Sequence, residues 1–208
     1  MIEQTTLITY MAILLGFVFI PGPAVLLTLA RSTSSGSKVG LATGLGIAVG
    51  DLVHTFLAVA GISSLILASA LLFNVIKYLG AAYLIYLGVK AIFEKSDPKV
   101  LGTLKAINIR DAFRQAVILE VLNPKSAMFF LAFLPQFVNP ENGMVAMQLV
   151  TLGVLFVLMS LISTIVVAIS AGRVGHFLRK NPSVMRWQNK VVGGIYCSLG
   201  LRIALQEK

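Results

Sequence analysis

The feature that most constrains this chain is its series of long apolar runs. A helix needs about 20 apolar residues to cross the ~30 Å hydrocarbon core of a bilayer, and several runs in the 208 residues are that long. Only 12% of the residues are charged, whereas soluble domains carry about 25%. Because lipid offers no partners to backbone groups, such spans form as helices. The sequence therefore predicts an all-α polytopic membrane protein, with residues 1–208 in one transmembrane domain.

Six transmembrane helices are predicted from the order of these runs. They cover approximately residues 6–30, 39–60, 75–93, 115–138, 145–171 and 191–205. The apolar stretch 39–73 is too long for one simple span and too short for two. We therefore expect an interruption at 61–64, followed by an interfacial or re-entrant segment. Five spans remain the alternative if the last run does not cross.

The basic residues set the predicted orientation. Loops 31–38, 94–114 and 172–190 contain twelve of the seventeen lysines and arginines. In an alternating six-span chain these loops lie on one side of the membrane, and positively charged loops face the cytoplasm. We expect 94–114 to be a basic cytoplasmic loop and both termini to face outward. The net charge of +9 thus marks membrane orientation and predicts no nucleic-acid partner.

Several chemical classes lack their residues in this sequence. Cys197 is the single cysteine, and His54 and His176 lie far apart, so neither a thiol relay nor a metal-ligand spacing is present. There is also no glycine-rich phosphate loop and no nucleophile motif. We expect no enzymatic activity, no cofactor and no metal. The first run is expected to stay as a span, because no Lys or Arg precedes Arg31 and a secretory signal needs a positive start.

Polar residues interrupt the fourth run at Glu120, Asn123 and Lys125. Pro124 removes one backbone N–H and frees polar backbone groups at that level. Ionisable residues at such depth are costly, and they indicate a substrate or ion pathway. We expect Lys125 to approach a substrate carboxylate while Asn123 holds the broken helix ends. The alternative is a kinked structural helix whose Glu120 and Lys125 reach toward the cytoplasmic interface.

The first run is broken in the same way by Pro21, Gly22 and Pro23. Two prolines around a glycine exceed what a simple kink needs. The N–H groups at the start of a half-helix attract carboxylates. The sequence therefore predicts that both breaks take part in substrate binding.

Asp51 and His54 lie three residues apart and share a face of the second predicted span. A carboxylate beside an imidazole can carry a proton across a membrane. We expect Asp51 to be the proton carrier, with His54 as the alternative carrier. Asp51 or Glu120 would also bind a substrate ammonium group. A purely structural Asp51, hydrogen-bonded to hydroxyl groups, remains open.

Glycine recurs every fourth residue in the same region, at Gly36, Gly40 and Gly44, and again at Gly46 and Gly50. Small residues at this spacing let two helices approach closely. The pattern predicts helix-packing faces.

The two halves of the chain resemble each other. Gly80, Tyr83 and Gly88 of the third span recur as Gly193, Tyr196 and Gly200 in the sixth. The segment 21–23 also lies 102 residues before 123–125. Because each half has three spans, a duplicated unit enters the membrane upside down the second time. We expect two inverted three-helix repeats, residues 1–93 and 115–208, with the two breaks close together near the midplane.

Four motifs in order resemble the lysine-exporter (LysE/RhtB) translocators: residues 21–23, 78–88, 123–125 and 135–137. The resemblance covers essentially the whole chain and is strongest to the branch that exports homoserine, threonine and leucine. It implies a protein of the bacterial inner membrane that exports amino acids from the cytoplasm in exchange for protons. The family supplies no roles for individual residues and does not choose the amino acid.

These observations favour a secondary exporter of small neutral amino acids, with the substrate, protons and the lipid bilayer as partners. A zwitterion needs one anion-binding and one cation-binding element held apart, and the breaks and buried carboxylates provide both. A passive amino-acid channel, or a membrane assembly protein without transport, is the alternative. The oligomeric state is left open, with a homo-oligomer among the outcomes.

Overall fold

The computed structural model describes residues 2–19, 22–68, 70–93 and 105–180, and single residues or pairs between 187 and 205. The helices are α1 Gln4–Phe19, α2 Pro23–Ser35, α3 Ser37–Ala68, α4 Ala70–Phe93, α5 Ile109–Val121, α6 Pro124–Met128 and α7 Val145–Lys180. A π-helix (η2, Phe129–Phe133) and two 3₁₀ helices (η3, Leu134–Phe137; η4, Pro140–Asn142) follow α6. The described residues contain no strand, and the prediction of an all-α protein is confirmed.

Two of the predicted spans are broken, as their prolines indicate. The axes of α1 and α2 are bent by 46°, and those of α5 and the segment Pro124–Phe137 by 43°. Pro21 lies outside the described residues, whereas Gly22 is the residue that precedes α2. A proline has no N–H to donate and fits the first turn of a helix, so each new half-helix starts at a proline.

Two helical segments are individually long and apolar enough to cross a membrane in the described part of the chain. They are Ser37–Gly61 of α3 and Val145–Arg173 of α7. If each bent pair is one span, the described residues hold four. The predicted sixth span, at about 191–205, falls largely outside the described residues, so the number six stays a prediction.

The expected interruption of the second span is wrong. α3 runs without a break from Ser37 to Ala68, 32 residues, through the stretch 61–64. A single glycine in a helix costs only about 1 kcal/mol, and no proline stands here to force an end. At 1.5 Å per residue the helix is about 48 Å long, so it exceeds the hydrocarbon thickness and must tilt or extend beyond it.

α5 begins at Ile109, inside the stretch 94–114 that is expected to be a loop. The side chain of Asn108 accepts a hydrogen bond from the backbone N–H of Asp111 at 2.9 Å, which caps the first turn. The carboxylate of Asp111 also lies in that first turn, where the helix dipole favours a negative charge. Local capping therefore starts the helix before the apolar run does.

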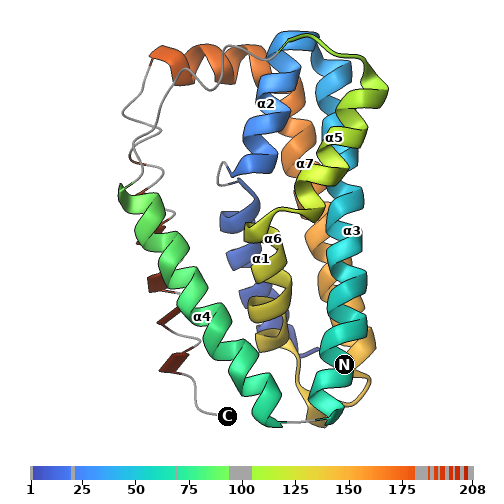
Figure 1. Ribbon diagram of the computed structural model, residues 1–208, viewed down its shortest axis with the longest axis vertical. Coiled ribbons are helices and arrows are strands. Elements are labelled where there is room, and N and C mark those ends of the chain that lie inside the picture. The colour runs from blue at the N-terminus through green and yellow to red at the C-terminus, as the bar shows by residue number, and fades with distance from the viewer. Residues whose placement is uncertain are drawn as a thin grey trace.

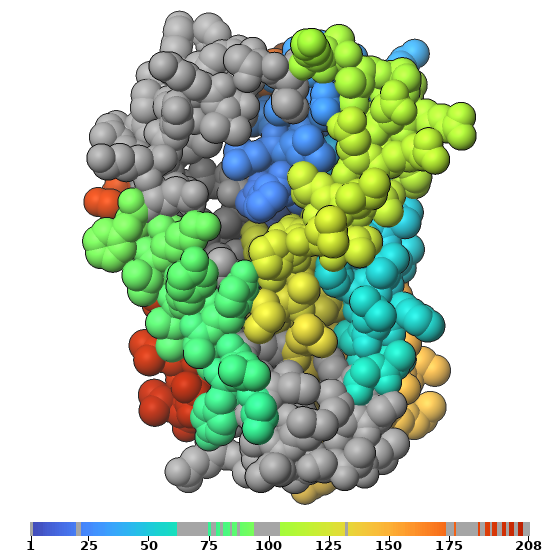
Figure 2. Space-filling view, viewed as in Figure 1, coloured from blue at the N-terminus to red at the C-terminus, as the bar shows by residue number. Residues whose placement is uncertain are grey.

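α3 is the central helix of the fold and packs against α2, α5 and α7. Figure 1 shows these helices side by side, with α1 and α6 continuing beyond the breaks and α4 slanting across the outside. In Figure 2, α4 (green) lies against the α6–η2 segment (yellow). The broken helices therefore meet in the middle of the molecule.

The glycines of α3 explain how closely its neighbours approach. A Cβ atom on Gly44 would lie 2.7 Å from the hydroxyl of Thr164 on α7, and one on Gly50 would lie 2.5 Å from Cβ of Glu120 on α5. The predicted packing faces are confirmed at these positions. Gly36 differs, because nothing lies within 4 Å of it and its φ of 89° instead permits the turn between α2 and α3.

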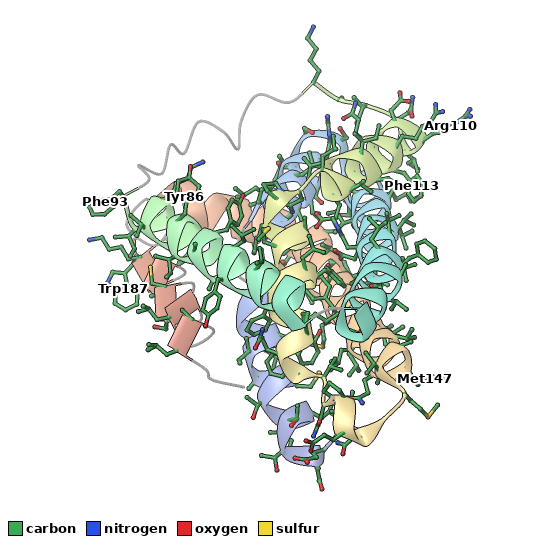
Figure 3. The ribbon with its side chains drawn as sticks, turned by 60° about the horizontal axis from the view of Figure 1, so that its bottom comes forward. Tyr86, Phe93, Arg110, Phe113, Met147 and Trp187 are labelled. Atoms are coloured by element: carbon green, nitrogen blue, oxygen red, sulfur yellow. The ribbon has the colours of Figure 1, made fainter. Side chains whose placement is uncertain are left out.

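Aromatic rings fill the space below the two breaks. Tyr10 and Phe17 of α1 contact Phe129 of η2, with ring centroids 6.4 and 4.4 Å apart, and Phe129 lies 4.7 Å from Phe156 of α7. Other large apolar side chains point outward: Figure 3 shows Tyr86, Phe93 and Met147 on the outer surface, and each is more than half exposed. In a membrane protein such residues face lipid.

Candidate functional site

The two helix breaks lie against each other. A Cβ atom on Gly22 would be 3.1 Å from Nζ of Lys125 and 3.2 Å from its Cδ, so any larger residue would crowd the lysine side chain. The expectation that the segments 21–23 and 123–125 lie close together is confirmed for Gly22 and Lys125. Their depth at the midplane stays a prediction.

A cavity lined by both polar and apolar side chains occupies this meeting point. Its lining includes six of the predicted site residues: Gly22, Pro23, Asp51, Glu120, Asn123 and Lys125. Pro124 is the first residue of α6, and His54 lies one turn along α3 from Asp51. The space measures ≈ 30 Å³ for a water-sized sphere, room for about two waters. An amino acid would therefore have to widen it.

The first break frees carbonyl groups, and side chains from distant helices bind them. Pro21 has no N–H for the carbonyl of Phe17, four residues earlier. The ammonium group of Lys125 donates to that carbonyl oxygen at 3.2 Å. The hydroxyl of Ser163 on α7 donates to the next carbonyl, that of Val18, at 2.9 Å. The broken end of α1 is thus tied to α6 and α7.

The second break follows the same rule. Pro124 has no N–H for the carbonyl of Glu120, again four residues earlier. His54 reaches this oxygen with Nε2 at 2.9 Å, and because a carbonyl only accepts, Nε2 carries the hydrogen. The imidazole also stacks on the ring of Phe130, with centroids 5.7 Å apart. His54 therefore holds the break closed from α3.

The carboxylate of Glu120 is buried and surrounded by donors. The side-chain amide of Asn123 lies 3.2 Å from each of its oxygens, and the hydroxyl of Ser126 donates to it as well. The oxygen of the same Asn123 side chain accepts from the backbone N–H of Lys125 at 3.0 Å and so caps α6. Asn123 does hold the broken ends together, as its position suggests.

The carboxylate of Asp51 has the opposite surroundings. Asp51 is 1% exposed, and neither of its side-chain oxygens forms a hydrogen bond of regular geometry among the described residues, although the side chains of Ser160 and Glu120 lie beside it. It shares the cavity with Glu120 and Lys125, because Gly50 lets α3 press directly against α5. An ionised carboxylate buried in this way is costly unless a positive group or a proton accompanies it.

The start of α2 adds a positive pole to the same cavity. Gly22 precedes the helix in an extended conformation, and no side chain caps this end. The first bond of the helix runs from the N–H of Leu26 to the carbonyl of Gly22 at 2.9 Å. The preceding amides, of Ala24 and Val25, have no intrahelical acceptor, and both residues line the cavity. The helix dipole makes this end attractive to anions.

One side of the cavity is apolar. Phe17, Val18 and Phe156 line it, and the ring of Phe17 lies 4.2 Å below the ammonium nitrogen of Lys125. The cavity thus combines a buried carboxylate, a helix N-terminus and an apolar wall. Within the described residues, no three His, Cys, Asp or Glu side chains gather closely enough to hold a metal ion.

Four further residues that contribute to the site were not identified from the sequence. Phe17 supplies a carbonyl, Ser126 donates to Glu120, and Ser160 and Thr164 of α7 line the cavity. The sequence could have indicated Phe17, because it stands four residues before Pro21 and its carbonyl therefore lacks a helical donor. It could also have indicated Ser160 and Thr164, because their hydroxyl groups lie one turn apart in an apolar run.

Proteins with similar sequences include translocators and efflux proteins. The chain matches the LysE type translocator family over residues 15–207. It is 29% identical to the leucine efflux proteins of Salmonella typhimurium and Salmonella typhi, over 98% of this chain and 98% of each relative. It is 31% identical to an uncharacterised membrane protein of Pseudomonas aeruginosa, over 91% of this chain and 92% of that one. No solved structure matches significantly. The chain belongs to the LysE type translocator family.

Proposed function

We propose that this protein is a secondary active exporter of small neutral amino acids, which it moves out of the cytoplasm. The observation that carries the proposal is the cavity between the two helix breaks. There Asp51 faces the same small space as the uncapped N-terminus of α2. A zwitterion presents one charge of each sign, and this cavity offers one partner for each. The naming of two relatives as leucine efflux proteins supports a neutral amino acid such as leucine as the substrate. Threonine and homoserine are included because the motifs of this chain resemble the branch that exports them.

Export against a gradient needs an energy source, and we assign it to proton antiport. Asp51 is the group best placed to take up a proton, since it is buried in the cavity without a hydrogen bond of regular geometry among the described residues. Ionisable residues in such positions are costly and commonly serve ion or proton pathways. His54 supports the break instead, because its Nε2–H is committed to the carbonyl of Glu120.

The proposed setting is the bacterial inner membrane, crossed by six spans in two inverted triplets. Contacts between α4 and the C-terminal segment support the repeat. A Cβ on Gly88 would lie 2.7 Å from the carbonyl oxygen of Gly193, and one on Gly200 would lie 2.7 Å from that of Ala81. If Gly80 and Gly88 correspond to Gly193 and Gly200, a two-fold axis in the membrane plane converts the first contact into one between Gly200 and Gly80, one residue away from the observed contact with Ala81.

Orientation is tested by labelling single cysteines from outside the cell, after Cys197 has been replaced by serine. A cysteine in loop 94–114 should stay unlabelled in intact cells, and one at the N-terminus should react. Labelling of the loop from outside would contradict the proposed orientation. It would leave the transport activity to be judged separately.

Transport is tested in cells loaded with dipeptides of leucine, threonine or lysine, with and without overexpression of the protein. We expect faster appearance of leucine or threonine in the medium, and no change for lysine. In proteoliposomes with an imposed proton gradient, the protein should move the amino acid against its own concentration gradient. A proton ionophore should abolish this uphill transport. Flux that follows only the amino-acid gradient, with or without the ionophore, would indicate the passive channel. No flux of any amino acid would overturn the proposed function.

A further inference from the structure

We infer that the carboxylate of Asp51 holds the substrate ammonium group and the counter-transported proton in alternation, while the N-terminus of α2 holds the substrate carboxylate. The inference rests on the proposed function and gives it a site and a coupling rule. The proton and the amino acid exclude each other because they use the same two oxygen atoms.

The charges of the cavity support this rule. Asp51 of α3, Glu120 of α5 and Lys125 of α6 all line it. If all three are ionised, the cavity carries one net negative charge. Glu120 already receives hydrogen bonds from Asn123 and Ser126, whereas Asp51 receives none of regular geometry from the described residues and has only the hydroxyl of Ser160 and the carboxyl of Glu120 beside it. The missing positive charge therefore belongs at Asp51.

The other titratable groups near Asp51 are engaged elsewhere. The hydroxyl of Tyr10, on α1, donates to the carbonyl of Leu152 at 2.9 Å. His54, on the same helix as Asp51, donates to the carbonyl of Glu120. α2 and α7 bring only neutral residues to the lining of the cavity. In the empty protein a proton on Asp51 neutralises the cavity, and an arriving ammonium group replaces it.

The substrate carboxylate has a separate place. The amides of Ala24 and Val25 have no intrahelical acceptor and line the cavity from α2. This end of α2 carries no side-chain cap, in contrast to α6, whose start is capped by Asn123. An α-carboxylate supplies the missing acceptor and suits the positive end of the dipole. Phe17, Val18 and Phe156 then face the substrate side chain, so the side chain is apolar.

The first test measures protons directly. Leucine is added to purified protein in weakly buffered detergent solution, from about pH 5 to about pH 8, and proton release is followed with an indicator dye. We expect nearly one proton released per leucine bound at the acidic end and less as the pH rises. Over the same range the apparent affinity should weaken by up to about tenfold for each pH unit of acidification. Leucine binding without proton release at every pH would overturn the inference.

Substrate analogues distinguish the ammonium-binding end of the site from its carboxylate-binding end without any mutation. N-acetyl-leucine lacks the ammonium group, so it should release no proton on binding. Leucinamide lacks the carboxylate, so it should bind more weakly than leucine and still release a proton. Proton release by N-acetyl-leucine equal to that by leucine would overturn the assignment of Asp51.

A pair of variants locates the exchanged proton. Asp51→Asn mimics the protonated carboxyl group, so it is expected to fold, to bind leucine at least tenfold more weakly and to release no proton. Asp111→Asn is the matched control, because it makes the same chemical change at an exposed carboxylate of α5 away from the cavity and should still release a proton when leucine binds. Leucine affinity of Asp51→Asn equal to wild type would overturn the inference. If the wild-type protein neither binds nor exports any amino acid, the proposed function itself fails.

Discussion

The ammonium nitrogen of Lys125 lies 3.2 Å from the carbonyl oxygen of Phe17 and 4.2 Å from the centroid of the Phe17 ring. One side chain therefore joins the second helix break to the first, across 108 residues of sequence. The sequence predicts that Lys125 approaches the substrate carboxylate. The structure places its ammonium group on a backbone carbonyl at the edge of the cavity, where it also offsets part of the negative charge of Glu120 and Asp51.

Replacing Lys125 with methionine should weaken both stability and binding. Met keeps the apolar stem but leaves the carbonyl of Phe17 without this donor, which costs about 1–3 kcal/mol for a buried acceptor. Because the two sides of the cavity lose their tether, leucine affinity should fall tenfold or more, or about 1.4 kcal/mol. Thermal unfolding in detergent and equilibrium binding measure the two effects.

The exposed Lys105 provides the matched control, since Lys105→Met makes the same chemical change away from the cavity. This substitution should change neither the unfolding temperature nor the leucine affinity. Normal leucine affinity in a well-expressed Lys125→Met protein would assign Lys125 to structure alone.

The closeness of α3 and α5 depends on Gly50. A Cβ atom there would lie 2.5 Å from Cβ of Glu120, an atom fixed to the backbone, so Gly50→Ala should force the helices apart. Overpacking of this kind costs about 1–3 kcal/mol, and it would displace Asp51 from Glu120. Gly61→Ala is the control, because nothing lies within 4 Å of Gly61 and α3 is helical there. Unfolding temperatures in detergent should fall for the first variant only; equal values for both would contradict the packing argument.

The breaks could be predicted because proline acts through covalent structure. Pro124 cannot donate to the carbonyl of Glu120 in any fold, and Asp51 is costly in any apolar surroundings. The same reasoning failed at Gly61, where a glycine costs only about 1 kcal/mol and tertiary packing decides the outcome. Local rules therefore predict a helix break where a proline forces one, but they do not predict whether a helix breaks at a residue, such as glycine, that only permits a break.

The partners at the breaks could not be predicted. Which group reaches the carbonyl of Glu120 depends on how α3 docks on α5, and the glycine spacing predicts that two helices meet without naming the pair. The sequence therefore suggests His54 as a proton carrier, whereas the structure places it as a donor to that carbonyl. Asp51 and Lys125 are singled out in the sequence by their charge within apolar runs and by their neighbours His54 and Pro124, whereas their common cavity follows only from the packing.

Asn123 has two roles that different substitutions separate. Its oxygen caps α6 by accepting from the N–H of Lys125, and its amide donates to the carboxylate of Glu120. Asn123→Ser keeps a capping oxygen but is too short to reach Glu120, so it should lower stability moderately. Asn123→Asp keeps the cap but sets a second carboxylate beside Glu120, and it should be the less stable variant near neutral pH. The unfolding temperatures of both variants in detergent, at neutral and at acidic pH, measure these stabilities. Acidification should reduce the stability difference between the two variants. An Asn123→Asp protein as stable as wild type at neutral pH would contradict the proposed contact between Asn123 and Glu120.

Substitutions of His54 show whether its buried imidazole carries protons or only binds the free carbonyl group at the second helix break. Gln can donate one hydrogen bond to the carbonyl of Glu120 but cannot be protonated near neutral pH. If His54 acts only through its Nε2–H bond at 2.9 Å, His54→Gln should keep uphill leucine export. His54→Phe keeps the stacking on Phe130 and removes the donor, so it should lose about 1–3 kcal/mol of stability. Export against a gradient in proteoliposomes, with unfolding measured in parallel, separates the roles. A stable His54→Gln protein that exchanges leucine but cannot drive it uphill would make His54 the proton carrier in place of Asp51.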